Sequence, residues 1–222
     1  MRTRIKTAVL AVALTGLLLA AAWGATTEKS PAAPENPAKV GECTLGDLAA
    51  DAARAAVTNA DVALIPGGHL LPQAIPAGQP VQEQFAEALL FPDEAVVVIE
   101  LKGNELKEAL ERSLGFLPRP SPTLLQVAGM SVSYRSADPA GKRVAAVQIG
   151  NAPLAADRVY RVAMPASLAK GAMGYYRVFG TRVVKQVGPS LREAVVKYAQ
   201  TSGATTVAPG QRLRDLSAPA AK

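Results

Sequence analysis

The longest stretch of patterned apolar positions lies between residues 61 and 103. Two short runs, 61–65 and 95–101, are almost continuously apolar and rich in β-branched residues, which is typical of strands buried on both faces. A double-glycine turn at 66–69, a Pro-Ala-Gly loop at 76–78 and a short helix over about 81–90 are predicted between them. The pattern therefore predicts two central strands beside a glycine turn that could approach a ligand.

Apolar residues at helical spacing predict three more helices. In one of them Leu106, Leu110 and Leu114 recur on a single face. Each predicted helix has a residue that can cap it: Thr44, in capping-box spacing with Asp47, for 45–58; Asn104 for the helix that Gly115 ends; and Ser190, in capping-box spacing with Glu193, for 191–201.

Short β-type runs follow one another in the second half of the chain, at 124–127, 131–134, 144–149 and 158–164. Consecutive strands of this kind predict antiparallel hairpins, whereas strict alternation with helices would indicate a doubly wound parallel sheet. We therefore expect the α+β class, with a single domain in which a mixed sheet is flanked by helices.

The first residues have the composition of an export signal. Arg2, Arg4 and Lys6 precede an apolar run at 8–22 that ends in small residues. The run is shorter than the ~20 residues of a membrane-spanning helix. We expect cleavage after Gly24 and a periplasmic or extracellular protein; the alternative is an uncleaved anchor, the only case in which membrane association is expected.

The rest of the chain divides by composition. Residues 25–40 are rich in Pro and Ala and have no apolar face, which predicts a disordered spacer. The domain is expected over 41–216, followed by a disordered tail at 217–222.

Charge and cysteine content exclude some classes of function. Residues 1–24 hold three of the 24 Lys and Arg residues, so 21 positive charges then face 18 negative ones. A net charge of +3 that is scattered along the chain does not indicate a nucleic-acid partner. Cys43 is the only cysteine, so no intrachain disulfide forms, and its expected role is that of a small buried apolar residue.

His69 is the only histidine, which limits the possible catalytic sites. A two-metal phosphoesterase centre needs several His and Asp ligands, and a serine hydrolase of the α/β type needs a Gly-x-Ser-x-Gly elbow, which is lacking. A Cys43–His69 pair is not excluded by spacing, but no motif supports it. We expect no catalytic residue, metal or cofactor, and a polar loop position for His69.

The glycine segments have a simple conformational interpretation. Gly67 and Gly68 match no phosphate-binding loop, and a tight turn with positive φ explains them; the same holds for Gly171 and Gly174. Tyr175 beside them could stack on a planar ligand, although a loop aromatic more often packs into the core.

Several motifs in order carry a family resemblance. Residues 61–68 read Asp-Val-Ala-Leu-Ile-Pro-Gly-Gly, 91–97 read Phe-Pro-Asp-Glu-Ala-Val-Val, and 171–175 read Gly-Ala-Met-Gly-Tyr. Over about 41–180 the chain resembles the C-terminal domain of secreted 5′-nucleotidases and UDP-sugar hydrolases. The resemblance implies a nucleotide-binding domain whose catalytic partner, a metallophosphoesterase domain, is expected to be missing here.

The binding motifs depart from the family pattern. The resemblance places the phosphate-facing arginine at Leu70, one stacking phenylalanine at Pro92 beside Phe91, the asparagine at Glu94 and the second phenylalanine near Ser167. We therefore expect the fold to persist and ordinary nucleotide affinity to be lost. The candidate ligand-binding residues are Gly67, Gly68, His69, Phe91, Glu94, Gly171, Gly174 and Tyr175.

Three functional hypotheses follow. The first is an exported, non-catalytic ligand-binding or scaffold module with a degenerate nucleotide pocket, whose ligand is a nucleotide-like small molecule. The second is an accessory substrate-binding subunit for nucleotide catabolism, with a separate metallophosphoesterase chain as partner. The third and least favoured is an enzyme that uses Cys43 or His69.

Overall fold

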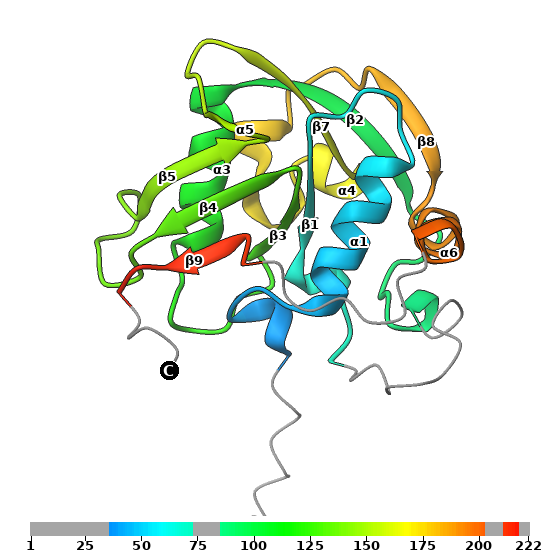
Figure 1. The fold of residues 1–222 in the computed structure, drawn as a ribbon, viewed down its shortest axis with the longest axis horizontal. Helices are drawn as coiled ribbons and strands as arrows, with labels where there is room; N and C mark the ends of the chain where they lie inside the picture. Colours follow the sequence, from blue (N-terminus) through cyan, green and yellow to red (C-terminus); the bar gives the residue numbers. More distant parts are fainter. Residues whose placement is uncertain (1–35, 73–84, 203–210, 218–222) are drawn as a thin grey trace, which may run out of the picture. The chain divides into compact units, whose positions relative to one another are not determined.

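Strand β7 (Val159–Pro165) lies in the middle of the larger of the two sheets that the described residues form (Figure 1). The computed structural model describes residues 36–72, 85–202 and 211–217. Its elements are η1 (Pro37–Lys39), α1 (Thr44–Ala55), β1 (Val62–Pro66), η2 (Gly67–His69), β2 (Ala95–Lys102), α3 (Gly103–Leu114), β3 (Leu125–Ala128), β4 (Met130–Tyr134), β5 (Val144–Ile149), β6 (Ala152–Pro153), β7 (Val159–Pro165), α4 (Ala166–Ala169), η3 (Ala172–Gly174), α5 (Tyr176–Phe179), β8 (Gln186–Ser190), α6 (Leu191–Ser202) and β9 (Leu213–Asp215).

The larger sheet is mixed, in the order β3-β1-β7-β2-β8. β1 and β7 run parallel, while every other pair in this sheet is antiparallel. The two apolar runs at 61–65 and 95–101 form β1 and β2, on either side of β7. The predicted α+β class with a mixed sheet is therefore confirmed.

The central strands are buried on both faces. Val62 and Leu64 of β1 belong to one apolar cluster, while Ala63 and Ile65 belong to another, and all four side chains are inaccessible to solvent. Successive side chains of a strand point to opposite faces, so a continuous apolar run serves two cores. One cluster contains α3 and residues of β4 and β5, and the other contains α1 and α6.

The smaller sheet has the order β6-β5-β4-β9. β4 and β5 form the predicted antiparallel hairpin, and β9 joins the other edge of β4 in parallel. The chain passes from the larger sheet to the smaller one at Gly129, which has φ +73° and lies where a Cβ would be 2.3 Å from the carbonyl oxygen of Asp61. A second sheet was not predicted.

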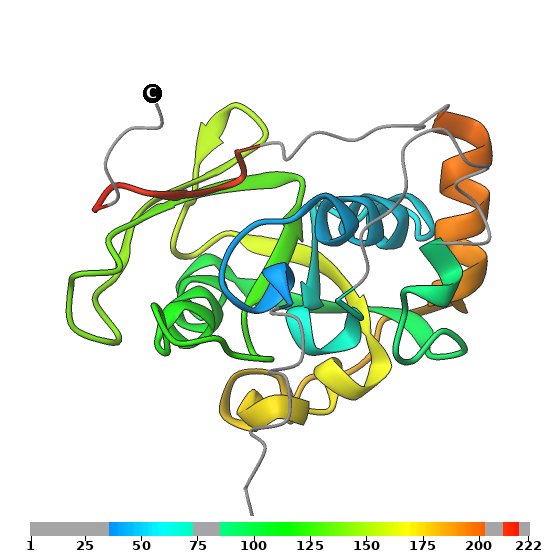
Figure 2. The same cartoon turned by 90° about the horizontal axis from the view of Figure 1, so that it is seen from below.

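Helix α1 packs against the larger sheet through small side chains, with α6 beside it (Figure 2). Ala49, Ala50 and Ala53 are completely buried, which allows the helix to approach the strands closely. The predicted cap is one residue off, because Cys43 is the N-cap and its Sγ accepts a hydrogen bond from Gly46 N at 3.3 Å. Cys43 is buried, as predicted.

The other two predicted helices differ in how they begin. α3 starts at Gly103, and Glu105 accepts a hydrogen bond from Lys102 N at 2.8 Å, so the predicted Asn104 cap is wrong. The capping box at α6 is confirmed, since Ser190 and Glu193 bond to each other's backbone amides. Of the helix predicted over 81–90, the described part is helical only at 85–87.

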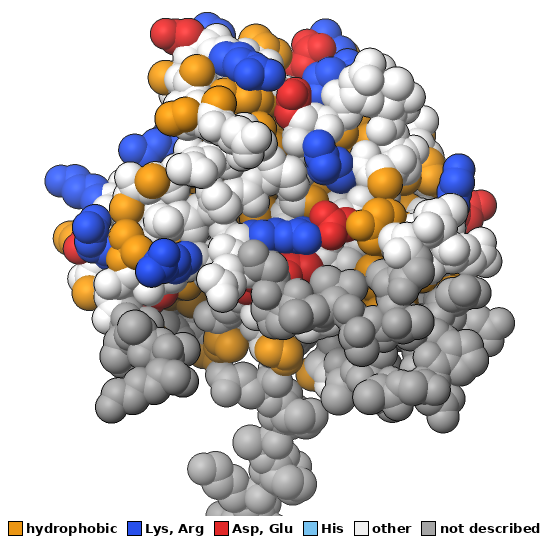
Figure 3. Space-filling view, viewed as in Figure 1, with side chains coloured by type: hydrophobic (Ala, Val, Ile, Leu, Met, Phe, Trp, Pro, Cys, Tyr) orange, Lys and Arg blue, Asp and Glu red, His pale blue; other side chains and the backbone are white. Residues whose placement is uncertain are grey.

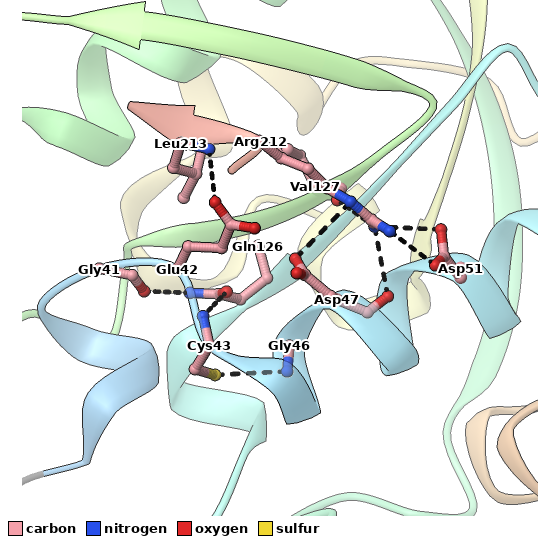
Figure 4. Close-up of polar contacts among 10 residues, drawn as sticks. All are labelled: Gly41, Glu42, Cys43, Gly46, Asp47, Asp51, Gln126, Val127, Arg212 and Leu213. Carbon is pink, nitrogen blue, oxygen red and sulfur yellow. Dashed lines mark hydrogen bonds and ion pairs between the residues drawn. The ribbon is translucent and has the colours of Figure 1, made fainter. Parts of the chain in front are cut away.

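The segment before α1 is docked on the domain. Asn36 donates a hydrogen bond to Leu70 O at 2.6 Å, and Gln126 donates to the carbonyl oxygens of Ala38 and Gly41 (Figure 4 shows the bond to Gly41). Because Ala38 is buried, the domain begins before residue 41, and the predicted spacer ends too late. The predicted signal segment, the spacer up to residue 35 and the tail from 218 lie outside the described residues.

Arg212 fixes β9 to α1 (Figure 4). Its Nη1 and Nη2 donate to the two carboxylate oxygens of Asp51 at 3.0 and 2.8 Å, and Nη1 also donates to Val127 O at 3.0 Å. Its Nε lies 3.9 Å from Asp47, which is fully buried. Burial would lower the pKa of Arg212, but the hydrogen bond with Asp51 and the nearby carboxylates raise it above its usual value.

The surface carries charges of both signs. On the face drawn in Figure 3, basic and acidic side chains alternate with apolar ones, and neither sign forms a large patch. Within the described part of the chain, none of the helices combines the length and the hydropathy needed to cross a bilayer.

Candidate ligand-binding site

A cavity of about 510 Å³ opens where the loop before β2 meets the segment after β7. Val96 of β2 pairs with Pro165 of β7, so the residues just before β2 lie beside those just after β7. The lining residues are Leu90, Phe91, Pro92, Asp93, Glu94 and Ser167.

The loop that carries most of these residues is held by backbone hydrogen bonds. Leu90 N donates to His69 O at 2.8 Å, while Arg192 N donates to Pro92 O and Leu191 N to Glu94 O, both at 2.8 Å. η2 and the start of α6 therefore fix both ends of the loop. The cavity is formed by the folded chain before any ligand binds.

Glu94 is the polar centre of this site. One carboxylate oxygen, Oε1, accepts a hydrogen bond from Ser167 N, and the other, Oε2, accepts one from His69 Nε2 at 2.9 Å. The side chain is 15% exposed. Burial alone would raise the pKa of Glu94, but the hydrogen bonds from His69 and Ser167 outweigh it and lower the pKa below its ordinary value. Glu94 is therefore ionised at neutral pH.

His69 is buried beside the cavity, with 1% of its surface exposed. Its ring meets the ring of Phe91 edge to face, with centroids 5.1 Å apart. Nδ1 has no hydrogen-bond partner within the described ranges. The expected position of His69 in a polar loop is therefore wrong, because the residue supports Glu94 and Phe91 from inside the protein.

Ser167, His69 and Glu94 do not form a nucleophilic triad. Ser167 Oγ lies 3.4 Å from His69 Nε2, the same nitrogen that donates to Glu94. In a triad the two ring nitrogens serve different partners, one for the carboxylate and one for the nucleophile. Here the nitrogen that faces Ser167 already carries the proton given to Glu94, so it cannot accept one from the serine.

The glycines at 67 and 68 contact protein atoms. Gly67 N donates to Leu124 O at 2.6 Å and Gly68 N donates to Pro122 O at 2.9 Å, so neither amide is free for a phosphate. Neither glycine has the predicted positive φ. Gly67 is required by close packing instead, because a Cβ there would lie 2.1 Å from Ala38 O.

The predicted late loop is also used for packing. Gly171 and Gly174 have φ values of +91° and +79°, as predicted. Tyr175 is completely buried, stacks on Phe179 and donates a hydrogen bond to Thr123 O at 2.7 Å. Of the two alternatives for Tyr175, the structure shows packing in the core.

The eight candidate residues thus divide into two groups. His69, Phe91 and Glu94 lie at the cavity, while the four glycines and Tyr175 hold neighbouring segments together. The candidate set omitted four lining residues, Leu90, Pro92, Asp93 and Ser167. The antiparallel pairing of the runs 95–101 and 158–164 would have indicated Ser167, since it places the end of one run beside the start of the other.

Metal ligands do not gather in the described ranges, where no group of three or more His, Cys, Asp or Glu side chains is suitably placed. A larger hollow of about 710 Å³ lies beside α1, but its charged groups already have partners within the protein. Arg212 pairs with Asp51 at 2.8 Å, Arg158 with Asp61 at 3.5 Å, and Arg54 Nε donates to Asp61 O at 3.0 Å. The smaller cavity is therefore the better candidate site.

Comparison with known proteins gives consistent matches. The chain is 29% identical over 118 residues to snake venom 5′-nucleotidase from Naja atra, a match covering 46% of this chain and 22% of that protein. A 5′-nucleotidase from Bos taurus is 28% identical over 99 residues, which cover 41% of this chain and 17% of that protein. The chain thus spans about a fifth of the length of these curated relatives.

Solved structures agree in fold. A 5′-nucleotidase precursor from Thermus thermophilus superposes with a TM-score of 0.71 at 29% identity, covering 82% of this chain and 37% of that one. The NAD nucleotidase of Haemophilus influenzae gives 0.64 at 16% identity, covering 82% and 34%, and shows the fold alone. The family model for the C-terminal domain of 5′-nucleotidases matches residues 23–181. The chain belongs to the 5′-nucleotidase C-terminal domain family.

Proposed function

We propose that this chain is an exported ligand-binding module that does not cleave nucleotides by itself. The observation that carries the proposal is the cavity beside Phe91, whose polar centre is the carboxylate of Glu94, held in place by His69 and Ser167. An apolar cavity with a few fixed polar groups is the usual form of a small-molecule site. Its groups are arranged to bind a ligand rather than to activate a nucleophile.

The two residues considered for an enzyme, Cys43 and His69, support the same proposal. Cys43 is buried, its Sγ caps α1, and burial raises the pKa of its thiol. A thiol in that state is a poor nucleophile. His69 uses Nε2 to hold Glu94, so neither residue is placed to attack or deprotonate a substrate.

Export is supported by the first residues and by two relatives. A basic start and a short apolar run precede the small residues near Gly24. One relative is described as a venom protein and another as a precursor. Detection of a mature chain that begins near Ala25 in the periplasm or medium would establish export.

A thermal-shift screen combined with an activity assay tests the function. We expect the purified protein to melt at a higher temperature with at least one nucleoside, nucleotide, nucleotide sugar or small amine, because a ligand selective for the folded state stabilises it. We also expect no release of phosphate from AMP in the presence of Mg²⁺, Mn²⁺ or Zn²⁺.

Two matched variants test whether the ligand binds in this cavity. Phe91 and Phe116 are similarly exposed, at 47% and 39%, but only Phe91 lines the cavity. Phe91→Ala should abolish the ligand-induced shift and Phe116→Ala should leave it unchanged. Metal-dependent phosphate release by the protein alone would refute the non-catalytic part of the proposal.

A second candidate function is that of a substrate-binding subunit for a separate metallophosphoesterase chain. Leu90 and Phe91 favour it, because each is 47% exposed at the cavity, where a second protein could cover them. If this function is correct, the chain should co-purify with such a phosphoesterase and lower its KM for nucleotides. An unchanged KM and no co-purification would count against it.

A further inference from the structure

The charge of the cavity is opposite to that expected for an anionic ligand. Its two charged lining residues are Asp93 and Glu94, and neither Lys nor Arg lines it in the part of the chain that the structure describes. The two internal segments outside that part, 73–84 and 203–210, contain no Lys or Arg in their sequence. A positive group does approach one of the carboxylates, since Arg192 Nε lies 3.6 Å from Asp93.

The Arg192–Asp93 pair does little to neutralise the cavity. Its side chains are 46% and 89% exposed, so solvent screens their interaction. Glu94 is far less exposed, at 15%, and it accepts its hydrogen bonds from His69 and Ser167. A negative phosphate brought beside this carboxylate would be repelled in a partly desolvated site.

Glu94 can still accept hydrogen bonds from a ligand. An ionised carboxylate has about four lone-pair positions. Ser167 N occupies one on Oε1 and His69 Nε2 occupies one on Oε2, and the side chain of Ser167 is a third hydrogen-bonding partner of the carboxylate, which leaves about one position for a ligand. A ligand with an N–H donor fits that requirement.

Phe91 adds an aromatic surface beside the same carboxylate. Its side chain is 47% exposed, and the edge contact with the buried ring of His69 fixes its orientation. The face of an aromatic ring attracts an organic cation, and Leu90 and Pro92 provide further apolar wall. The cavity therefore combines a fixed negative charge with an aromatic and aliphatic lining.

From this combination we propose that the cavity binds a small organic cation, in which an amine or amidine is carried on a flat apolar body. The inference rests on the proposed ligand-binding function and specifies the chemical class of the ligand. An N–H group of the cation bonds to Glu94, and its apolar body packs on Phe91 and Leu90. Phosphorylated nucleotides are rejected by the same carboxylate.

A charge series on the unmodified protein tests the proposal. Phenethylamine, 2-phenylethanol and phenylacetate share a phenyl body and differ in the charge of the head group. Titration calorimetry at pH 7 and low salt should show binding of the amine, at least about tenfold weaker binding of the alcohol, and no binding of the acid. Added salt should weaken the binding of the amine only.

Two variants then test whether Glu94 provides the negative charge that binds the amine. Glu94→Gln should reduce the affinity for phenethylamine about tenfold and change that for the alcohol little. Glu108→Gln, an exposed change on α3, is the matched control and should have no effect. If Glu94→Gln does not fold, the charge series still decides the question, since it uses the natural sequence.

The outcomes separate the inference from the proposed function. Equal affinity for the three compounds, or preference for the acid, overturns the inference. Binding of a nucleoside or nucleotide at Phe91 without binding of amines also overturns it but keeps the ligand-binding function. Failure of every compound in both screens overturns both.

Discussion

Glu94 receives hydrogen bonds from two segments that are distant from it in the sequence. His69 belongs to η2 and Ser167 to α4, so the carboxylate holds the ends of β1 and β7 together. The same hydrogen bonds keep the carboxylate ionised, so they determine both the shape and the charge of the site.

This arrangement predicts a pH-dependent contribution to stability. The pKa of Glu94 is lowered in the folded protein relative to an ordinary value of 4.5. A carboxylate whose pKa is lower in the folded state than in the unfolded state stabilises the protein at pH values above its unfolded-state pKa. This stabilisation is lost as the pH falls through the folded-state pKa. The difference in unfolding free energy between the natural protein and Glu94→Gln should therefore shrink below about pH 4.5.

Urea denaturation at several pH values between about 5 and 3 measures this difference. His69, Asp93 and Arg192 are retained in both proteins, so the comparison isolates Glu94. A difference that stays constant or grows towards low pH would contradict the prediction.

At Gly67 the requirement for glycine is steric. A Cβ at this position would meet Ala38 O at 2.1 Å, whereas a Cβ at Gly41 would meet nothing within 4 Å. Gly67→Ala should cost about 1–3 kcal/mol, because backbone must shift to admit the methyl group. Gly41→Ala is the control and should stay within about 0.5 kcal/mol of the natural protein. Urea denaturation of both variants checks this, and equal stabilities would contradict it.

Single residues show the limits of prediction from the sequence. The sequence predicts that Gly67 and Gly68 must be glycines. It does not predict the reason, because a segment distant in the sequence packs against them and local sequence does not reveal such a contact. His69 and Glu94 are candidates through the family resemblance, yet their mutual hydrogen bond depends on tertiary structure. Tyr175 could have faced a ligand or the core, and it packs in the core.

At the scale of elements, β9 is attached largely through side chains. The strand has three residues and, within the described residues, pairs with β4 alone. Arg212 immediately before it reaches Asp51 and Asp47 on α1. The carboxylate of Glu42 also accepts a hydrogen bond from Leu213 N at 2.8 Å. Since so short a strand has few backbone hydrogen bonds of its own, the arginine provides much of its attachment.

Removal of this arginine should destabilise β9 and α1 together. Arg212→Met keeps the apolar stem but leaves the buried carboxylate of Asp47 without this cation. We expect a loss of about 2 kcal/mol, less than for a fully buried pair because the guanidinium is partly exposed. Urea denaturation measures the loss, and hydrogen exchange should show faster exchange at Leu213.

Arg214→Met is the control for this experiment. Arg214 lies two residues further along, within β9, and is exposed to solvent. It should change stability by less than about 0.5 kcal/mol. Equal effects of the two substitutions would show that Arg212 has no special role.

Prediction from the sequence succeeded for elements with a clear run of apolar residues. It failed for segments that are held by contacts with parts of the chain far away in the sequence. β1, β2, β7 and α3 follow runs whose apolar spacing alone identifies them. β9 and the docking of residues 36–40 were missed, because each is stabilised by polar contacts with distant segments. The N-cap of α1 was misplaced because a cysteine takes the position usually held by Ser or Asp.

The molecule as a whole is organised by one sheet that separates two cores. One core contains Cys43 and the helices α1 and α6, and the other contains Tyr134, Tyr160 and Tyr175 with the smaller sheet. The strands β1 and β2 contribute to both, so loss of either core exposes an apolar face of the same strands.

We therefore expect the two cores to unfold together. The Cys43 thiol reports on one core through its reaction with a thiol reagent, and tyrosine fluorescence reports largely on the other, with three of the five tyrosines there. The two urea transitions should have the same midpoint, as two-state unfolding requires. Cys43→Ala gives the background of the thiol assay, and separate midpoints would show that the cores are independent.

The docked segment before α1 has a mechanical consequence. Because Asn36 is bound to Leu70 and Ala38 to Gln126, tension applied to the chain ahead of Asn36 is transmitted to η2 and β3. The carbonyl oxygen of His69 in η2 accepts a hydrogen bond from Leu90 N at 2.8 Å, so a pull from that side would also load the loop beside the ligand cavity.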